Sequence, residues 1–472
     1  MKTLKNLGFA GLLALGTFGH AVAEDRVILR TNPTAIHSLE SQFGLKVEKD
    51  LSNGQGTYLV RMPNLPGVTQ ILGKHPAVSH VEANSSVIVP EAVAGTATKF
   101  SLVPDPKNPG RYGTPVSQLT GTTKSDVSGK LMTALPSYGL YMAQPGIAKI
   151  NMPPSILSWT GHGVKIAVID TWIDASNTVL NGSINTQLAY DTIGNTPGGA
   201  SIQQETSPFI DQETSPFIDG TGTVMVNQET SPFIDQETSP FIDQETSPFI
   251  DGAAFGHGTM VAGLVHRVAP AATLIPIRAF QNDGSGSMAD VIQGIYYAVD
   301  VAKVDIISMS FSAPTDSSEL KAAIQYAQKN GVICVAAVSN SNSGANVYPA
   351  AESGVIGVAA TDYVDFKASF SDYGSDVELS APGVSMTSTY PCDKAGKQHW
   401  AMSSGTSFAV PLVSGAAAVM KSLNYSAIDA SNASKFLDKA ADPILDPVYR
   451  NQLGKGRLDV LGTAFLVKFG GN

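Results

Sequence analysis

Short apolar segments alternate with polar ones from Glu24 to about Pro90. "RVILR", "LKVEKD", "TYLVRM" and "VSHVEANSSVIV" have the pattern of strands, whereas "TAIHSLESQF" and "VTQILGKH" have helical spacing. The resulting order is strand, helix, strand, strand, helix, strand. This order predicts a small α+β unit of the split βαβ, ferredoxin-like type.

A second pattern begins near Tyr138. Continuous apolar runs at "KIAVID", "TLIPIRAF", "VDIISMS", "GVICVAAV" and "GVIGVAA" are typical of parallel strands buried on both faces, and helical patterns separate them. One helix is predicted over Met288–Val301, with Ser287 and Asp290 as a capping-box-like start. We therefore predict an α/β domain over residues 137–472, a doubly wound, mostly parallel sheet with helices on both faces. A dinucleotide-binding fold is set aside because no G-x-G-x-x-G follows the first strand.

The N-terminus and the stretch between the two units have other patterns. Residues 1–23 combine Lys2 and Lys5, a short apolar core and an Ala-Val-Ala ending, which predicts a secretory signal peptide too short to span a membrane. Residues 91–136 are rich in Pro, Gly, Ser and Thr, which indicates a linker in or near which maturation cleavage is expected. We expect a secreted protein without a membrane span, extracellular or, in a cell with an outer membrane, periplasmic.

Asp170, His257 and Ser407 each stand where a strand is predicted to end or a helix to begin. Catalytic groups of open α/β sheets collect at that edge. A serine hydroxyl is a weak nucleophile alone; a histidine must take its proton, and a carboxylate must orient the imidazole. Ser407 precedes a helix of small and apolar residues, whose first amides favour negative charge. The set therefore predicts nucleophilic acyl transfer.

The motifs "VKIAVIDTWID", "GHGTMVAGLV" and "GTSFAVP", in this chain order, resemble those of subtilisin-like serine proteases, the subtilase family or peptidase S8. The resemblance covers roughly Tyr138 to the C-terminus, apart from an insertion. It implies a subtilisin-like fold and a serine endopeptidase that hydrolyses peptide bonds through an acyl-enzyme. In that mechanism Ser407 attacks the carbonyl, His257 transfers the proton, and Asp170 orients His257.

Asn340 follows a buried strand in "VICVAAVSNSNSG". By resemblance it is the asparagine of the oxyanion hole, although Ser339 replaces the glycine that usually precedes it. A turn residue is the other interpretation of Asn340, and Asn342 is the alternative candidate for the role.

Ser310, Phe311 and Ser312 lie in "SMSFSAP", which resembles the strand that pairs with the substrate backbone. Val347 stands where a glycine often lines the floor of the primary specificity pocket. Because Ser312-Ala313 and Val347 add bulk relative to the family, we expect a shallow pocket that favours small or medium apolar residues.

Residues 24–90 resemble, less closely, the inhibitory propeptide that precedes many subtilases, assists their folding and then occupies the active-site cleft. The piece "HPAVSHVEAN" carries most of this similarity. A small accessory domain is the competing interpretation.

An octapeptide, "QETSPFID", occurs five times within residues 204–251, and the octet Gly220–Asn227 interrupts the series. The last copy resembles a segment before the catalytic histidine of several secreted bacterial subtilisins. The copies carry ten acids and no base; without them acids and bases are equal, at 30 each, so the net charge of −10 indicates no charged partner. A proline every eight residues bars a long helix, and we expect an exposed passive loop. A rim that gates substrate or binds a partner is the alternative.

No metal ligand set is predicted, and no H-E-x-x-H exists. His257 reaches Val268-Ala269-Pro270 through only ten residues, so the calcium-binding loop of many subtilisins is expected to be missing; calcium at a non-standard site stays open. Of the two cysteines, Cys334 is expected to be a buried inert thiol, and whether it pairs with Cys392 is open. No cofactor, nucleic acid or membrane is expected, and the partners are protein or peptide substrates and the protein's own propeptide.

The sequence therefore predicts a secreted, subtilisin-like serine endopeptidase, made as a self-processing preproprotein and expected to be a monomer. Two alternatives remain. One is a catalytically idle binding or adhesion protein on the same scaffold, and the other is an enzyme that cleaves only its own propeptide. The presence of Asp170, His257, Ser407 and Asn340 together argues against an idle scaffold.

Overall fold

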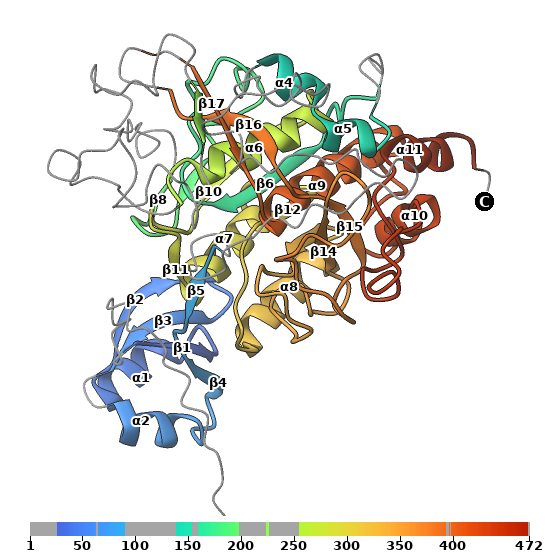
Figure 1. Ribbon diagram of the computed structural model, residues 1–472. Helices are drawn as coiled ribbons and strands as arrows, with labels where there is room; N and C mark the ends of the chain where they lie inside the picture. The colour runs from blue at the N-terminus through green and yellow to red at the C-terminus, as the bar shows by residue number, and fades with distance from the viewer. Residues whose placement is uncertain are drawn as a thin grey trace, which may run out of the picture.

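The computed structural model describes residues 26–62, 65–89, 138–152, 159–197, 223–225, 254–392, 396 and 398–470 (Figure 1). The predicted signal peptide 1–23, the linker 91–136 and the five octapeptide copies lie outside the described residues.

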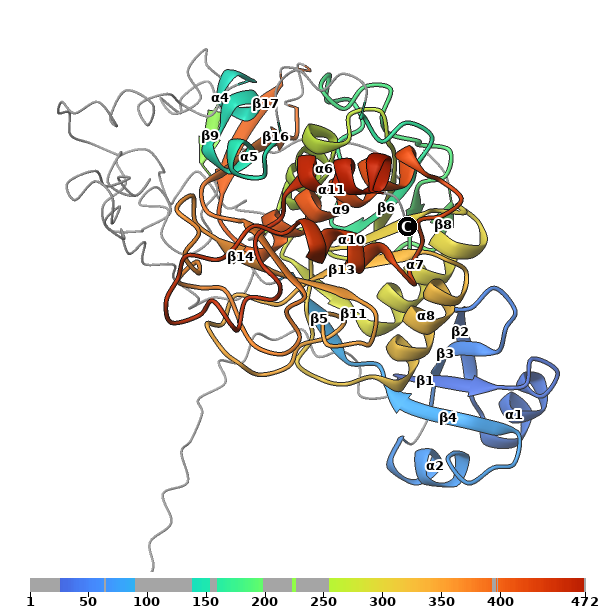
Figure 2. The same ribbon diagram turned by 90° about the vertical axis from the view of Figure 1, so that its right-hand side faces the viewer.

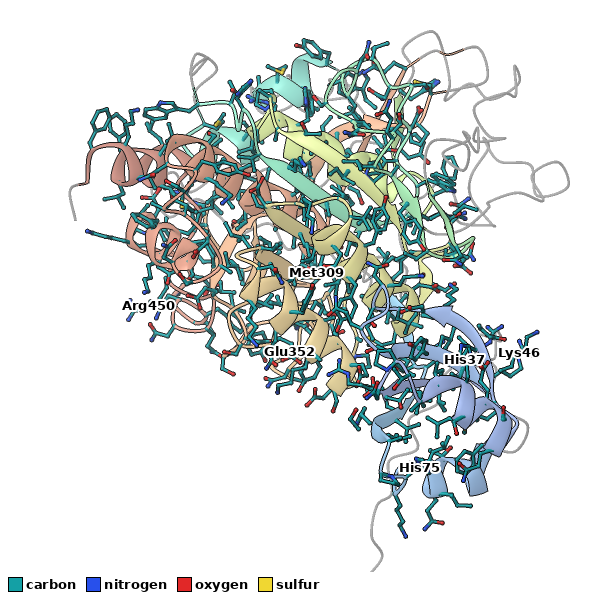
Figure 3. All side chains as sticks on the ribbon, turned by 180° about the vertical axis from the view of Figure 1, so that it is seen from behind. His37, Lys46, His75, Met309, Glu352 and Arg450 are labelled. Carbon is teal, nitrogen blue, oxygen red and sulfur yellow. The ribbon has the colours of Figure 1, made fainter. Side chains whose placement is uncertain are left out.

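A small unit precedes the main one along the chain. Its elements are β1 (Arg26–Thr31), α1 (Ile36–Phe43), β2 (Lys46–Asp50), β3 (Thr57–Arg61), α2 (Leu65–Leu72) and β4 (Val78–Ala83). The strands form an antiparallel sheet in the order β2-β3-β1-β4 around an apolar core of its own. The predicted order of strands and helices is confirmed. His37, Lys46 and His75 lie on the side of this unit that faces away from the rest of the molecule (Figure 3).

The single strand predicted for "VSHVEANSSVIV" is wrong, because the segment forms two strands. β4 ends at Ala83, and β5 (Ser86–Ile88) leaves the small sheet to pair with β11 (Ser285–Ser287). Between them, the side-chain oxygen of Asn84 accepts a hydrogen bond from the backbone N–H of Ala289 at 2.9 Å. A partner 205 residues away in the sequence therefore redirects the chain, and local alternation cannot show this.

The main sheet has eight strands in the order β15-β14-β13-β12-β6-β10-β7-β8. These are β6 (Lys165–Asp170), β7 (Tyr190–Asp191), β8 (Thr196–Pro197), β10 (Thr273–Arg278), β12 (Ile306–Met309), β13 (Ile333–Ala337), β14 (Ile356–Thr361) and β15 (Leu379–Pro382). All neighbouring pairs are parallel except β7 and β8. The predicted doubly wound, mostly parallel sheet is confirmed.

Helices cover both faces of this sheet (Figures 1 and 2). One face carries α6 (His257–Val268), α9 (Thr406–Leu423), α10 (Ala433–Ala440) and α11 (Val460–Phe469), and the other carries α7 (Met288–Asp300) and α8 (Ser318–Lys329). The alternation along β6 explains this: Ile166 and Val168 belong to the first core, whereas Ala167 and Ile169 belong to the second. Met309 lies deep in the second core (Figure 3).

The helix predicted at Met288 is confirmed. α7 begins there, and the hydroxyl of its N-cap Ser287 accepts the backbone N–H of Asp290 at 3.2 Å. α8 begins in the same way, since the hydroxyl of Ser317 accepts the N–H of Leu320 at 3.0 Å. Both helices therefore start at defined positions on the side that meets the small unit (Figure 2).

Beyond the main sheet, α4 (Tyr138–Ala143) and α5 (Pro145–Lys149) precede β6, and a three-stranded sheet lies beside α6. That sheet has the order β16-β17-β9 and consists of β16 (Met386–Tyr390), β17 (His399–Ser403) and β9 (Thr223–Met225). β9 comes from the octet that interrupts the repeats and runs parallel to β17. The predicted loop insertion therefore contributes one strand.

Among the described residues, one helix is long and apolar enough to cross a membrane, namely α9. Of its 18-residue apolar window, 89% is buried inside the molecule. This burial is typical of a core helix.

Candidate active site

Asp170 is the last residue of β6, and only 1% of its side chain is exposed. Its Oδ1 atom accepts a hydrogen bond from the backbone N–H of Thr171 at 2.7 Å. The apolar run of β6 is buried on both faces, so its charged residues, Lys165 and Asp170, stand only at its two ends. The sheet thereby holds the side chain of Asp170 at the edge where its parallel strands end.

His257 is the first residue of α6, and its Nδ1 atom lies 2.7 Å from Oδ1 of Asp170. Both side chains are almost completely buried, at 3% and 1% exposure. Gly256 before it has φ 77°, a left-handed conformation that suits glycine. A buried carboxylate at this distance fixes the orientation of the imidazole and stabilises its charged form.

Close backbone packing holds this pair in place. The N–H of Gly258 donates to the hydroxyl of Thr171 at 3.0 Å. A Cβ atom on Gly258 would lie 2.6 Å from the carbonyl oxygen of Trp172 and 2.8 Å from that of Thr171. Glycine is therefore required here, because any side chain would push α6 away from the end of β6 and separate His257 from Asp170.

Ser407 is the second residue of α9 and is fully buried. Its hydroxyl donates to the carbonyl oxygen of Ser310 at 3.1 Å, and the hydroxyl of Ser310 donates back to the carbonyl oxygen of Ser407 at 3.0 Å. The ring of the next residue, Phe408, lies 5.4 Å from the ring of His257. The structure thus brings the start of α9 against the Asp170–His257 pair.

Asn340 lies three residues past β13, and its side-chain oxygen accepts two hydrogen bonds from Thr406, one from the backbone N–H and one from the hydroxyl, both at 2.9 Å. These bonds fix the amide beside Ser407, with its NH₂ group on the other side. The side chain of Asn342 points elsewhere, since its oxygen accepts a hydrogen bond from the ammonium group of Lys367 at 2.7 Å. Geometry therefore favours Asn340 over Asn342 as the oxyanion donor. Ser339 adopts φ 81°, a glycine-like conformation.

The predicted substrate-binding residues lie along the same edge. Ser310, Phe311 and Ser312 directly follow β12, and Ser312 pairs with Ile88 of the small unit. The next residue, Ala313, exchanges backbone hydrogen bonds of 2.8 Å with Tyr348, which places the neighbouring Val347 beside this strand. Val347 is 9% exposed and shares an apolar core with Phe311 and Ala313.

Arg278 was missed by sequence reasoning. It ends β10 directly opposite Asp170, and its guanidinium lies 4.8 Å from the ring centre of Trp172 and 3.3 Å from the carboxylate of Asp191. Trp172 therefore covers a cation next to Asp170. Strand register alone brings the two together, and no motif in the sequence marks Arg278.

The small unit contacts the larger one through the N-termini of α7 and α8. Glu82 accepts hydrogen bonds from the hydroxyl of Ser317 at 2.5 Å and the N–H of Ser318 at 3.0 Å. Lys49 lies 2.5 Å from Asp290, and Arg30 lies 2.7 Å from Glu319. Anionic or amide oxygens at helix N-termini are favourable because the first N–H groups lack partners in the helix.

β5 continues this contact into the edge that carries Ser407. Ile88 and Ser312 exchange hydrogen bonds at 3.4 and 3.2 Å, and the N–H of Val89 donates to the carbonyl oxygen of Gly284 at 2.9 Å. Val87 and Val89 are 2% and 0% exposed. The end of the small unit is therefore held as an extended strand between β11 and the segment that follows β12.

His266 lies in the last turn of α6, and its Nδ1 atom lies 3.0 Å from the hydroxyl of Ser183. Burial, with a smaller contribution from Arg267, lowers the pKa of His266 to about 4. His266 therefore lies on the same helix as His257.

Replacing His266 by glutamine is expected to remove part of the acid sensitivity of the fold. Between about pH 6.5 and 4 the unfolded chain binds a proton at His266 and the folded chain does not, so the free energy of unfolding falls as the pH falls. The two pKa values correspond to roughly 3 kcal/mol over this window. Urea unfolding at several pH values measures it. His162→Gln, at an exposed position, is the control, and an equal pH slope in His266→Gln and the unmodified chain would contradict the assignment.

Cys334 lies in β13, and its complete burial raises the pKa of the thiol to about 12. Such a thiol is inert. Among the described residues, no group of three His, Cys, Asp or Glu side chains lies close enough together to hold a metal ion.

The profile of the subtilase family matches residues 161–456, which is more than half of the chain. The thermostable alkaline protease of Halalkalibacterium halodurans is 42% identical over 176 residues, 35% of this chain and 47% of that protein, so the match spans about half of that relative. Thermitase of Thermoactinomyces vulgaris is 39% identical over 40% of this chain and 68% of its own length. Subtilisin DY of Bacillus licheniformis is 37% identical over 44% and 77%.

The crystal structure of fervidolysin from Fervidobacterium pennivorans, described as a keratinolytic enzyme related to subtilisin, superposes with a TM-score of 0.63 over 94% of this chain and 61% of that one. At 19% sequence identity this likeness concerns the fold. The fold, the family profile and relatives named as proteases agree with the geometry at the sheet edge, and the chain belongs to the subtilase family of serine proteases.

Proposed function

We propose that this protein is an exported endopeptidase in which Ser407, His257 and Asp170 form the catalytic triad. The observation that carries the proposal is the buried His257–Asp170 pair, 2.7 Å apart, beside the start of the helix that bears Ser407. His257 takes the hydroxyl proton of Ser407 as the serine oxygen attacks the carbonyl carbon of the scissile bond. The same proton then passes to the leaving amine, and water hydrolyses the resulting acyl-enzyme.

The tetrahedral intermediate carries an oxyanion that needs hydrogen-bond donors. The backbone N–H of Ser407, in the first turn of α9, is one donor, and the side-chain NH₂ of Asn340 is the second. Because Thr406 holds the amide oxygen of Asn340 through two hydrogen bonds, the donor is oriented before substrate binds. Preorganised donors of this kind stabilise the transition state more than the substrate.

Replacing Asn340 by alanine is expected to lower kcat by roughly 10²–10³-fold with little change in KM, because the lost donor acts on charge that develops only in the transition state. Initial rates on a peptide substrate measure this. Asn342→Ala removes an amide whose oxygen bonds to Lys367 and is the matched control. A larger loss of kcat in Asn342→Ala would assign the oxyanion role to that residue.

The primary specificity pocket is proposed to favour small or medium apolar residues on the acyl side of the scissile bond. Val347 precedes Tyr348, whose backbone pairs with that of Ala313, and both Val347 and Ala313 are buried, so side-chain volume is already present at this edge. A library of peptides that vary at the acyl residue should give alanine, valine or leucine the highest kcat/KM. A preference for phenylalanine or tyrosine would contradict the shallow pocket.

Several further features of the proposed enzyme rest on sequence and family. Residues 1–23 would direct export and be removed, residues 24–90 would act as the propeptide, and the cut that releases the mature domain would fall in or near 91–136. The contacts of Glu82 with α8 and of β5 with β11 support the propeptide role. We propose no cofactor; α6 runs unbroken from His257 to Val268, so the chain has no loop there for calcium.

Labelling with a fluorophosphonate, followed by peptide mass mapping of the secreted protein, tests the proposed function. A single adduct on Ser407 is expected, together with loss of the N-terminal region. If the folded, processed protein never acquires an adduct, the triad is not functional. The protein would then be interpreted as a binding protein on a subtilase scaffold and not as an enzyme.

A further inference from the structure

The loop that carries Asn340 is held by one neighbouring segment of the chain. The loop comprises Ser339–Ser343 and follows β13, and the segment comprises Phe370–Tyr373 between β14 and β15. Three backbone hydrogen bonds join the two, from the N–H of Asn342 to Phe370 at 2.7 Å, of Asp372 to Ser339 at 3.1 Å, and of Tyr373 to Ser343 at 3.0 Å. None of these three bonds uses the side chain of Asn342.

Asp372 adds its side chain to this contact. Its Oδ1 atom accepts the backbone N–H of Ser343 at 2.8 Å, and the N–H of Ser341 also bonds to the carboxylate. Asp372 is only 2% exposed. One buried carboxylate therefore holds two N–H groups of the loop within three residues of Asn340.

The loop has a backbone conformation that needs such support. Ser339 has φ 81° and Asn342 has φ 51°, so left-handed residues stand on both sides of Asn340. Residues other than glycine keep this conformation only where surrounding contacts enforce it. Thr406 orients the amide of Asn340, but the position of its Cα atom depends on the loop backbone. A displacement of about 1 Å can cost roughly 100-fold in rate.

We propose that Asp372 is a positioning residue for the hydrolysis: its carboxylate holds the loop Ser339–Ser343 so that the NH₂ group of Asn340 points at the oxyanion. This inference rests on the proposed function, because it concerns the same oxyanion site. Asp372 acts through Asn340 and transfers no proton itself.

The charge of Asp372 makes the hold on the loop dependent on pH. Burial raises the pKa of its carboxyl group from 3.8 to about 6, although the two N–H groups lower it. Asp376 faces the carboxylate and raises its pKa, and Lys367, which itself faces Asp446, lowers it. The loop Ser339–Ser343 contains no charged side chain. A protonated carboxyl group accepts N–H bonds more weakly than a carboxylate does, so the loop is held most firmly above about pH 6.

Two variants made in the full chain test the proposal. Asp372→Ala is expected to lower kcat roughly 10-fold with little change in KM, because the amide of Asn340 remains but is less well oriented. Asp372→Asn keeps one acceptor oxygen and should recover part of this loss. Rates are divided by the concentration of sites that take up a fluorophosphonate, so a smaller folded fraction does not alter kcat. An unchanged kcat in both variants, or a loss confined to KM, would overturn the proposal.

A double-mutant cycle shows whether Asp372 acts through Asn340. In the Asn340→Ala background no amide remains to be positioned, so adding Asp372→Ala should lower kcat by less than about 2-fold. A further loss of roughly 10-fold would make the effect of Asp372 independent of Asn340, and the proposal would be wrong.

The pH dependence gives a readout that a purely structural residue would not change. The ratio of kcat in the unmodified chain to kcat in Asp372→Asn cancels the titration of His257, which both proteins share. The two kcat values are expected to be equal near about pH 5, where Asp372 is protonated, and to separate as the pH rises to about 8. A ratio that is independent of pH would contradict the role of the carboxylate.

Asp305→Asn is the matched control. Asp305 is also buried, and its carboxylate accepts the backbone N–H of Lys165 at 2.9 Å, but it precedes β12, whereas Ser310 follows that strand. Its replacement should leave kcat unchanged at every pH. A loss of kcat as large as that in Asp372→Asn would mean that any buried aspartate has this effect, which would refute the positioning role.

The proposed function can fail separately from this inference. If the unmodified chain neither takes up a fluorophosphonate on Ser407 nor cuts any peptide, the endopeptidase assignment fails, and the role of Asp372 falls with it. If the chain labels and cuts peptides, and the Asp372 variants do so at the same kcat, the endopeptidase stands and only the role of Asp372 is refuted.

Discussion

Replacing Ser407 by alanine is expected to lower kcat for peptide hydrolysis by about 10⁶-fold, the loss found for the nucleophile of subtilisin, a member of the same family. The hydroxyl is fully buried at the start of α9 and donates a hydrogen bond to the carbonyl oxygen of Ser310 at 3.1 Å. Its replacement by a methyl group removes the proposed nucleophile with little disturbance of packing. Some rate above that in water should remain, because the oxyanion donors and the substrate strand are untouched. The chain should also accumulate with its N-terminal region attached, since the proposed enzyme processes itself.

Ser414→Ala is the matched control for this experiment. Ser414 lies on the same helix and is equally buried, and its hydroxyl donates to the hydroxyl of Ser308 at 2.9 Å, away from His257. Its replacement should leave kcat unchanged. Normal hydrolysis and processing in Ser407→Ala, in protein freed of contaminating proteases, would show that Ser407 is not the nucleophile.

Asp170→Asn is expected to lower kcat by about 10⁴-fold, the loss known for the same exchange in a serine protease triad. The shape of the side chain is kept, so the effect is chemical. An amide beside Nδ1 of His257 cannot stabilise the imidazolium, and it can hold the ring in the tautomer whose Nε2 atom carries the proton and cannot accept another. KM should change little, because Asp170 lies behind the histidine and does not contact the substrate.

Asp174→Asn is the control for the aspartate. Asp174 is also buried and nearby in sequence, but its carboxylate accepts the backbone N–H of Cys392 at 2.7 Å and that of Ser176 at 2.8 Å. It should affect stability more than kcat. Comparable losses of kcat in the two variants would mean that the charge of Asp170 is not used in proton transfer, and steady-state rates across pH would separate the cases.

A residue's role could be predicted from the sequence where that role follows from the residue's position at the end of its own strand or the start of its own helix. The apolar run of β6 must be buried, so the acid that ends it lies at the carboxyl edge of the sheet, and the same reasoning applies to His257 and Ser407 at helix starts. The capping pair Ser287 and Asp290 likewise marks the beginning of α7 without tertiary information. These inferences depend only on contacts between residues that are a few positions apart in the sequence.

Contacts between residues far apart in the sequence could not be predicted from the sequence. β5 leaves its own sheet because a better partner exists in β11, and Arg278 lies beside Trp172 because β10 and β6 share a register. The choice between Asn340 and Asn342 also needed the structure, since two asparagines two positions apart look alike until Thr406 and Lys367 select their orientations.

The sequence by itself determined the fold class, the family and the three residues proposed for the triad, since burial of apolar runs and the chemistry of Ser, His and Asp are local properties. Only the tertiary structure decided where the end of the small unit lies. Docking of Ser86–Val89 between β11 and Ser312 depends on hydrogen bonds between strands about 200 residues apart, whose energy is gained only when the whole sheet edge has formed.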